Sequence, residues 1–145
     1  MIRWRVEATA STGETSKQPP FKRSRDSAEY HGTVSIDPDT ATELPVLHWF
    51  VERPARADTR SGTRASVFYK GRFYDNIFCR TRGQSTANWE KPKYKFDFHK
   101  GQHFFVSDDL PKVEEFNLNS FLRGHTREPA MFTYLTDAGA NAPHT

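Results

Sequence analysis

Apolar and polar residues alternate with a period of two at residues 2–9, 93–99 and 113–119, a pattern that predicts β-strands. A mostly apolar run at 44–51 predicts another strand, and the segments 65–69 and 72–81 predict the two strands of a hairpin. Within 65–81, Lys70 and Gly71 supply a turn whose glycine tolerates a positive φ, so this segment predicts a hairpin. We therefore expect an antiparallel sheet.

The strand at 93–99 separates its side chains into two chemically distinct faces. Its aromatic and polar positions alternate: Tyr94, Phe96 and Phe98 against Lys93, Lys95, Asp97 and His99. The alternation at 113–119 is interrupted by the adjacent Glu114 and Glu115, which indicates a slip in phase.

One helix is predicted near the end of the sequence. Thr126 fits the N-cap position, Pro129 fits the first turn, and Gly139 fits the C-terminal stop. Apolar residues between them recur at i, i+1, i+4 and i+7 and define one helical face: Met131, Phe132, Leu135 and Ala138. The polar segment 55–64 is expected to be a loop. The predicted fold class is α+β, a β-rich antiparallel sheet with one C-terminal helix.

The first 35 residues are assigned to a separate part of the chain. Residues 2–9 resemble the last strand of a β-module, and one strand cannot build a sheet alone. Residues 1–35 are therefore expected to be the tail of a preceding β-module or a linker arm, with an edge strand of the main domain as the alternative. The main domain is assigned to residues 44–145.

Positive charge is concentrated in the middle of the chain. The formal net charge is +3, but twelve Lys/Arg and four Asp/Glu lie from Arg53 to Lys100, a local net of +8 that leaves −5 for the rest. A basic middle flanked by acidic ends indicates either an anion site or a solvated basic surface.

The remaining composition excludes several classes of protein site. A single cysteine, Cys79, excludes a disulfide within the chain and a CxxC metal site, and its apolar neighbours predict a buried side chain. Six histidines show no metal-ligand spacing. No apolar run reaches the ~20 residues of a membrane span, and the N-terminus has no apolar signal-peptide core.

The candidate chemistry lies between two predicted strands. Arg82, Gly83, Gln84 and Ser85 form a turn with small side chains, hydroxyls and exposed backbone N–H groups, and such a turn can wrap an anion. Arg82 could bind phosphate oxygens in bidentate fashion. Lys93 and Lys95 share one face of the next strand, about 7 Å apart. The alternative is an ordinary β-turn followed by solvent-facing lysines.

The predicted helix carries two further candidates. Arg127 could project toward the same site, and Glu128 could pair with a strand lysine, as in kinase-like lobes. Alternatively, Glu128 only complements the positive end of the helix dipole.

Four blocks of the chain, in this order, resemble the CotH kinase family over residues 44–145. They are Leu44–Leu47; Arg82–Ser85 followed by 91–96 (KPKYKF); 116–120 (FNLNS); and 127–132 (REPAMF), which runs on to 137–143. Arg127 matches the arginine that opens the helix of the family. The chain departs from the family at one position: a few residues before that arginine the family usually has an acidic residue, and this chain has Leu122 or one of its neighbours there.

The resemblance implies the N-terminal part of an atypical protein kinase, with a β-rich N-lobe and ATP plus Mg²⁺ or Mn²⁺ as cofactors. Arg82, Gly83, Gln84 and Ser85 would cover the nucleotide, Lys93 or Lys95 would contact its phosphates, and Arg127 would belong to the same site. The catalytic and metal-binding aspartates of the family would follow the helix, so we expect the given chain to be a truncated, incomplete domain without activity alone. The resemblance also implies an extracytoplasmic or cell-surface parent protein with a protein substrate.

Two other functions compete with this interpretation. A non-catalytic surface module could use the basic middle of the chain to bind an acidic partner. Nucleic-acid binding is disfavoured, because the aromatic residues of 93–99 lie opposite the lysines, whereas base-stacking platforms need both on one surface.

Overall fold

The structure is a computed structural model that describes residues 1–37, 39, 42–84, 90–119 and 127–140, with only the backbone described for 127–129. The strands are β1 (Ile2–Trp4), β2 (Val6–Thr9), β3 (Thr15–Gln18), β4 (His31–Thr33), β5 (His48–Val51), β6 (Thr63–Tyr69), β7 (Arg72–Arg82), β8 (Lys93–Asp97) and β9 (Glu115–Leu118). The helices are α1 (Pro54–Ala57) and α2 (Arg127–Asp137).

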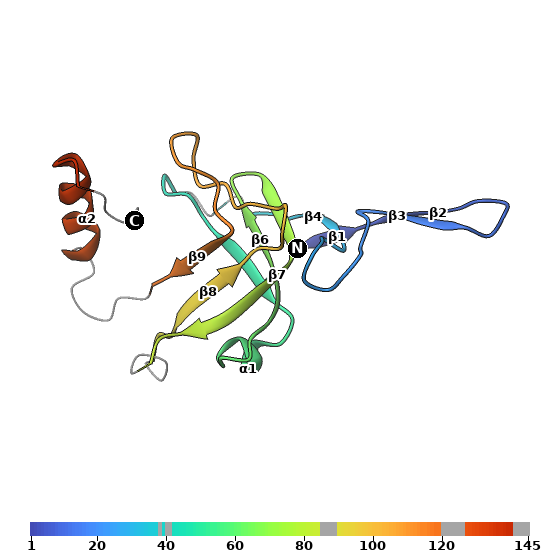
Figure 1. Ribbon diagram of the computed structural model, residues 1–145, viewed down its shortest axis with the longest axis horizontal. Coiled ribbons are helices and arrows are strands. Elements are labelled where there is room, and N and C mark those ends of the chain that lie inside the picture. The colour runs from blue at the N-terminus through green and yellow to red at the C-terminus, as the bar shows by residue number, and fades with distance from the viewer. Residues whose placement is uncertain (38, 40–41, 85–89, 120–126, 141–145) are drawn as a thin grey trace.

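A five-stranded antiparallel sheet forms the centre of the molecule (Figure 1). Its strands follow chain order, β5-β6-β7-β8-β9, and each pairs antiparallel with the next. Two separate two-stranded ribbons, β1-β4 and β2-β3, precede it in the sequence. The predicted β-rich, antiparallel architecture is confirmed.

The β6–β7 hairpin has the predicted turn. Lys70 and Gly71 have φ angles of 45° and 74°, and Tyr69 pairs with Arg72 across the turn. Two consecutive positive φ angles match the right-handed twist of the flanking strands, which explains a two-residue turn here.

A β-bulge in β7, which the alternation pattern did not indicate, changes the phase of the strand. Ala65 pairs with Ile77, but two residues later Val67 pairs with Tyr74, so β7 carries one extra residue. Asn76 absorbs the bend with a φ of 55°, a conformation that Asn tolerates better than most residues. Because of the bulge, Tyr74 and Ile77 both face the core although they are three residues apart.

The core is largely aromatic. Phe96 at its centre is fully buried, meets the Trp49 ring edge-on at 5.3 Å and stacks on Phe116 at 4.8 Å between centroids. Phe104 comes from the long connection between β8 and β9 and lies 4.6 Å from Phe116. Each aromatic ring buries a large area, which is how a chain of mean hydropathy −0.81 fills a core.

The segment that carries Phe104 is held by a backbone bridge. Phe104 and Val113 exchange both N–H···O bonds, at 2.8 and 3.1 Å. Strand β9 then begins at Glu115. The predicted phase slip at Glu114–Glu115 therefore lies at the boundary between this bridge and the regular pairing of β9 with β8.

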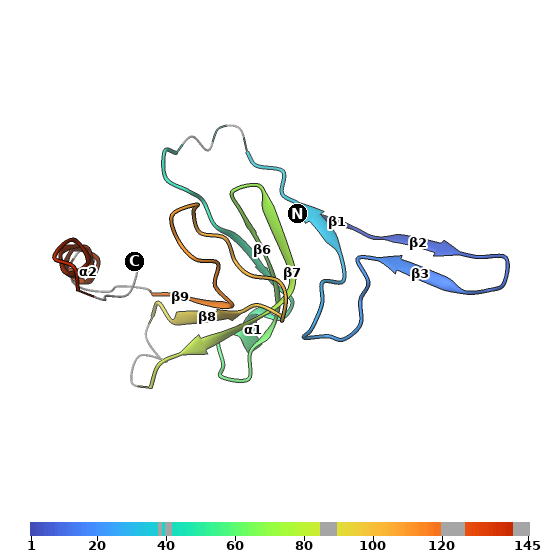
Figure 2. The same ribbon diagram turned by 45° about the horizontal axis from the view of Figure 1, so that its top comes forward.

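Residues 1–33 form an arm, and the buried carboxylate of Asp75 is one of the groups that anchor it to the sheet. Asp75, in the bulge of β7, accepts the backbone N–H groups of Glu29 and Tyr30 at 3.1 and 2.9 Å and the hydroxyl of Ser66 at 2.8 Å. Arg3 of β1 lies 3.8 Å from the same carboxylate. Figures 1 and 2 show the β2–β3 hairpin extending away from this anchor into solvent.

Several predicted boundaries differ from the structure. Residues 2–9 form two strands in different ribbons, because β1 pairs with β4 whereas β2 turns back onto β3. The strand expected at 44–51 begins only at His48, after Pro45, which has no N–H group to donate to a sheet. The short helix α1 overlaps the first residues of the expected loop 55–64, and it begins with a proline at Pro54.

Helix α2 ends at Asp137, and Gly139, the predicted stop residue, follows with a φ of 79°. The N–H groups of Gly139 and Ala140 bond the carbonyls of Thr136 and Leu135, which is a Schellman motif. Thr126 lies outside the described residues. The expected apolar face is not buried, since Met131 is 57% exposed and Leu135 only half-buried.

Candidate functional site

The central sheet has one core face and one polar face, which we call the open face. Alternation along β7 places Cys79 and Thr81 in the core and points Phe78, Arg80 and Arg82 the other way. Alternation along β8 places the Lys95 and Asp97 side chains on this same open face. The prediction that Lys93, Lys95 and Asp97 share a face is supported, whereas His99, beyond the end of β8, is buried.

Cations stand opposite one another on adjacent strands of the open face. Arg80 pairs with Lys95, and Arg82 pairs with Lys93 at the end of the hairpin. We call these four residues the cationic ladder. Like charges directly opposite each other destabilise a sheet, so this arrangement calls for counter-charges or for a bound anion.

Two carboxylates neutralise one half of the ladder. The Lys95 ammonium lies 3.1 Å from Asp97 and in direct contact with Glu115, and Asp97 also lies 3.7 Å from Arg80. The hydrogen bonds to Glu115 and then to Asp97 raise the pKa of Lys95 above its ordinary value. Lys95 is therefore firmly cationic but already engaged.

The other half of the ladder consists of Arg82 and Lys93. Among the residues that the structure describes, Arg82 has no hydrogen-bond or ion-pair partner for its guanidinium. Lys93 lies directly across from it and does make contacts of its own. The end of the hairpin thus offers one arginine ready to bind an anion.

The chain leaves β7 through Gly83, whose φ of 102° excludes ordinary side chains. Its carbonyl accepts a 2.7 Å hydrogen bond from the Arg60 guanidinium, which holds the start of the turn. Gln84 follows and is exposed. Ser85 and the neighbouring Thr86 lie outside the described residues.

The structure brings Arg82, Gly83, Gln84, Lys93 and Lys95 to one end of the β7–β8 hairpin. Helix α2, which begins with Arg127, lies apart from the sheet in both views (Figures 1 and 2). The side chains of Arg127 and Glu128 lie outside the description. Glu128 was expected to pair with a strand lysine, but one of the two candidates, Lys95, pairs with Asp97 and Glu115.

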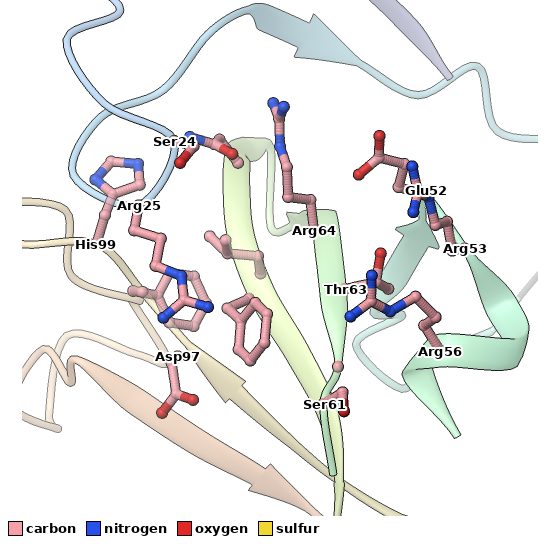
Figure 3. A pocket seen from close by; sticks show the side chains of 15 residues that line it. Ser24, Arg25, Glu52, Arg53, Arg56, Ser61, Thr63, Arg64, Asp97 and His99 are labelled. Atoms are coloured by element: carbon pink, nitrogen blue, oxygen red, sulfur yellow. The ribbon is translucent and has the colours of Figure 1, made fainter. Parts of the chain in front are cut away.

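A pocket of about 460 Å³ opens on the same face, next to the ladder and beneath the N-terminal arm (Figure 3). Four arginines and two carboxylates are among its lining residues: Arg25, Arg53, Arg56, Arg64, Glu52 and Asp97. The sequence predicted a basic middle region but not this pocket, because the arm and the sheet that enclose it are far apart in the chain.

Two buried polar side chains line this pocket without satisfied hydrogen bonds. Within the described residues, neither ring nitrogen of His99, which is 8% exposed, has a hydrogen-bond partner. The Oδ1 atom of Asn76, which is 4% exposed, has none there either. Burial lowers the pKa of His99, so its ring is neutral at pH 7. The backbone groups of Asp75 and Lys100 near the ring partly oppose this lowering of the pKa, although neither forms a regular hydrogen bond with it. Buried polar atoms without partners are rare in proteins.

The described residues fit an anion better than a metal ion. Arg82 and Lys93 provide cationic donors for phosphate oxygens. In the described part of the chain, no group of three His, Cys, Asp or Glu could hold a metal ion. Within the same residues, no helix is long and apolar enough to cross a membrane.

Comparisons with protein-family models, with curated proteins and with solved structures gave no match to this chain.

Proposed function

We propose that the chain is part of a CotH-kinase-like domain and that the hairpin end of its cationic ladder binds the phosphates of ATP. Arg82 and Lys93 are the direct contacts, and Gly83 and Gln84 supply backbone N–H groups. The proposal includes two further implications of the family resemblance. The parent protein would be extracytoplasmic or at the cell surface, and ATP would bind together with a divalent metal ion.

One observation carries the proposal: Arg82 and Lys93 lie directly opposite each other at the mouth of a glycine turn. Two like charges in register repel, and a phosphate between them removes that repulsion. A guanidinium also matches phosphate geometry with two parallel N–H···O bonds.

Lys95 has a supporting role in this proposal. Its ammonium is engaged by Asp97 and Glu115, so a phosphate would have to compete with two carboxylates for it. Lys95 therefore contributes positive potential and holds β9 against β8, and the Arg82 guanidinium is the principal phosphate contact.

The proposal assigns binding, not phosphate transfer, to this chain. The two carboxylates of the ladder region, Asp97 and Glu115, are both used by Lys95. With ATP and Mg²⁺ we expect turnover no faster than in buffer; a clearly higher rate would overturn this part of the proposal.

Titration with a fluorescent ATP analogue tests binding. Arg82→Ala should weaken binding about tenfold or more, because it removes charge-assisted hydrogen bonds. Arg72→Ala is the matched control, since Arg72 lies at the other end of β7 and its guanidinium lies over the Phe105 ring. Equal affinities of the Arg82 variant and the unmodified chain would refute the site.

A second candidate function is the docking of an acidic partner on the open face. The observation that favours it is the spread of cations along the face, from Arg64 on β6 to Arg82 at the hairpin end. Such docking would bind polyanions such as heparin with steep salt dependence and would weaken by similar, small steps for each cation removed.

A further inference from the structure

We propose that the pocket between the arm, α1 and the open face is a second binding site, and that its ligand is a small phosphomonoester carrying hydroxyl groups. This site is separate from the ATP site at the hairpin end. Figure 3 shows Arg25 on the arm side of the pocket and Arg53 and Arg56 on the α1 side.

The charge of the pocket matches a dianion. Its lining contains four arginines and two carboxylates, a net of +2 with His99 neutral. A phosphomonoester carries close to two negative charges at neutral pH, whereas a single carboxylate carries one. The pocket therefore fits a phosphate better than a simple organic acid.

Three of the arginines are available as donors. Among the described residues, the guanidinium groups of Arg53 and Arg56 have no hydrogen-bond or ion-pair partner. The Arg25 guanidinium lies over the Phe78 ring at 4.8 Å, which fixes its plane and leaves its N–H edge for another group. Arg64 is already bound to Glu29 at 2.5 Å.

The buried residues of the pocket require more than an anion. A neutral His99 ring has one N–H donor and one acceptor nitrogen, and the side-chain oxygen of Asn76 has no partner in the part of the chain that the structure describes. The amide of Asn76 is oriented by its 2.8 Å bond to the Ser27 carbonyl, so Oδ1 cannot exchange places with the nitrogen. Two acceptors call for hydroxyl donors on the ligand.

The dimensions of the pocket agree with a metabolite. Its volume of about 460 Å³ lies within the range of roughly 300–1,000 Å³ common for small-molecule sites. Ser24 and Arg25 come from the arm, so a ligand there would link the arm to the sheet.

Isothermal titration of the full chain with glucose 6-phosphate, inorganic phosphate and citrate tests the proposal. We expect saturable binding, tightest for glucose 6-phosphate, and a loss of tenfold or more in an Arg53→Ala/Arg56→Ala variant. Arg72→Ala is the control and should bind as the unmodified chain does.

His99→Phe separates a binding role from a structural one. Phenylalanine keeps the bulk of the ring but removes both nitrogens, so affinity for glucose 6-phosphate should fall while thermal stability is kept or increases. A fall in stability with unchanged affinity would contradict the proposal.

Three other outcomes overturn the site. They are absence of saturable glucose 6-phosphate binding, tighter binding of citrate, and equal affinity in the double arginine variant. Arg82→Ala distinguishes the two sites: it should weaken ATP and leave glucose 6-phosphate unchanged, and parallel losses of both ligands would reduce two sites to one.

Discussion

Asp75 shows how much a single buried side chain can determine. Its carboxylate is 1% exposed and accepts hydrogen bonds from two backbone N–H groups of the arm and from Ser66. Asp75→Ala would leave the N–H groups of Glu29 and Tyr30 without their acceptor. We expect the free energy of unfolding to fall by about 3 kcal/mol in chemical denaturation.

The control for Asp75 is Asp108→Ala, because Asp108 is exposed. That variant should change the free energy of unfolding by less than about 0.5 kcal/mol. Equal effects of the two substitutions would show that the carboxylate does not anchor the arm.

Cys79 makes the stability of the fold depend on pH in the alkaline range. Burial, followed by the nearby charges of Asp58 and Asp97, raises the pKa of its thiol from the ordinary 9.0 to about 12. In the unfolded chain the thiol loses its proton first, so the unfolded state binds fewer protons between these values. Stability should fall as pH rises from 9 toward 12, by about 1.4 kcal/mol per unit.

Urea denaturation at pH 8, 9, 10 and 11 measures this effect. In Cys79→Ala the stability at pH 8 is lower because of the cavity, but the decline between pH 9 and 10 should disappear. A variant with the same decline as the unmodified chain would assign the pH dependence to other groups.

At the scale of elements, two glycines with similar backbone angles allow the cost of backbone strain to be distinguished from the cost of steric crowding. Gly62 before β6 and Gly71 in the β6–β7 turn have φ angles of 63° and 74°. A Cβ at Gly62 would lie 2.6 Å from the Cys79 carbonyl oxygen, whereas a Cβ at Gly71 meets nothing within 4 Å.

Gly71→Ala should therefore cost about 1 kcal/mol, the strain of a left-handed alanine. Gly62→Ala should cost at least about 2 kcal/mol more, since β6 must also move from β7. Thermal or chemical denaturation of both variants gives the difference, and equal losses would mean that the close approach at Gly62 is easily relieved.

Alternation and turn residues predicted much of the sheet, because both are local properties. The β6–β7 hairpin follows from Lys70 and Gly71, and β8 follows from its strict alternation. The bulge at Asn76 could not be predicted, since it accompanies the contact of Asp75 with Tyr30 of the arm, 45 residues away in the sequence. Strand pairing of 2–9 was also missed, because its partners lie in segments without a strong pattern.

At the scale of the whole molecule, the arm is anchored at one end only. The β2–β3 hairpin is exposed at every residue and extends away from the sheet (Figure 1). Replacing residues 7–17 by a short glycine linker should change the free energy of unfolding of the sheet by less than about 1 kcal/mol. Denaturation followed by tryptophan fluorescence checks this, and a larger loss would assign the hairpin a stabilising contact.

The candidate site was predictable only where it is local. Arg82, Lys93 and Lys95 were found because adjacent strands of one hairpin bring them into register. The pocket joins Arg25 of the arm to Arg53, just before α1, and to Arg56 within it, and nothing in the spacing of these residues indicates that they meet. Contacts of long sequence separation need the folded arrangement.

The alternation of β8 has a consequence for folding fidelity. If β8 paired with β7 one residue out of step, Lys93, Lys95 and Asp97 would enter the aromatic core while Tyr94 and Phe96 would face water. Burying three charges is far more costly than any gain in backbone pairing. The same lysines proposed to attract a ligand therefore also ensure that the hairpin closes in a single alignment.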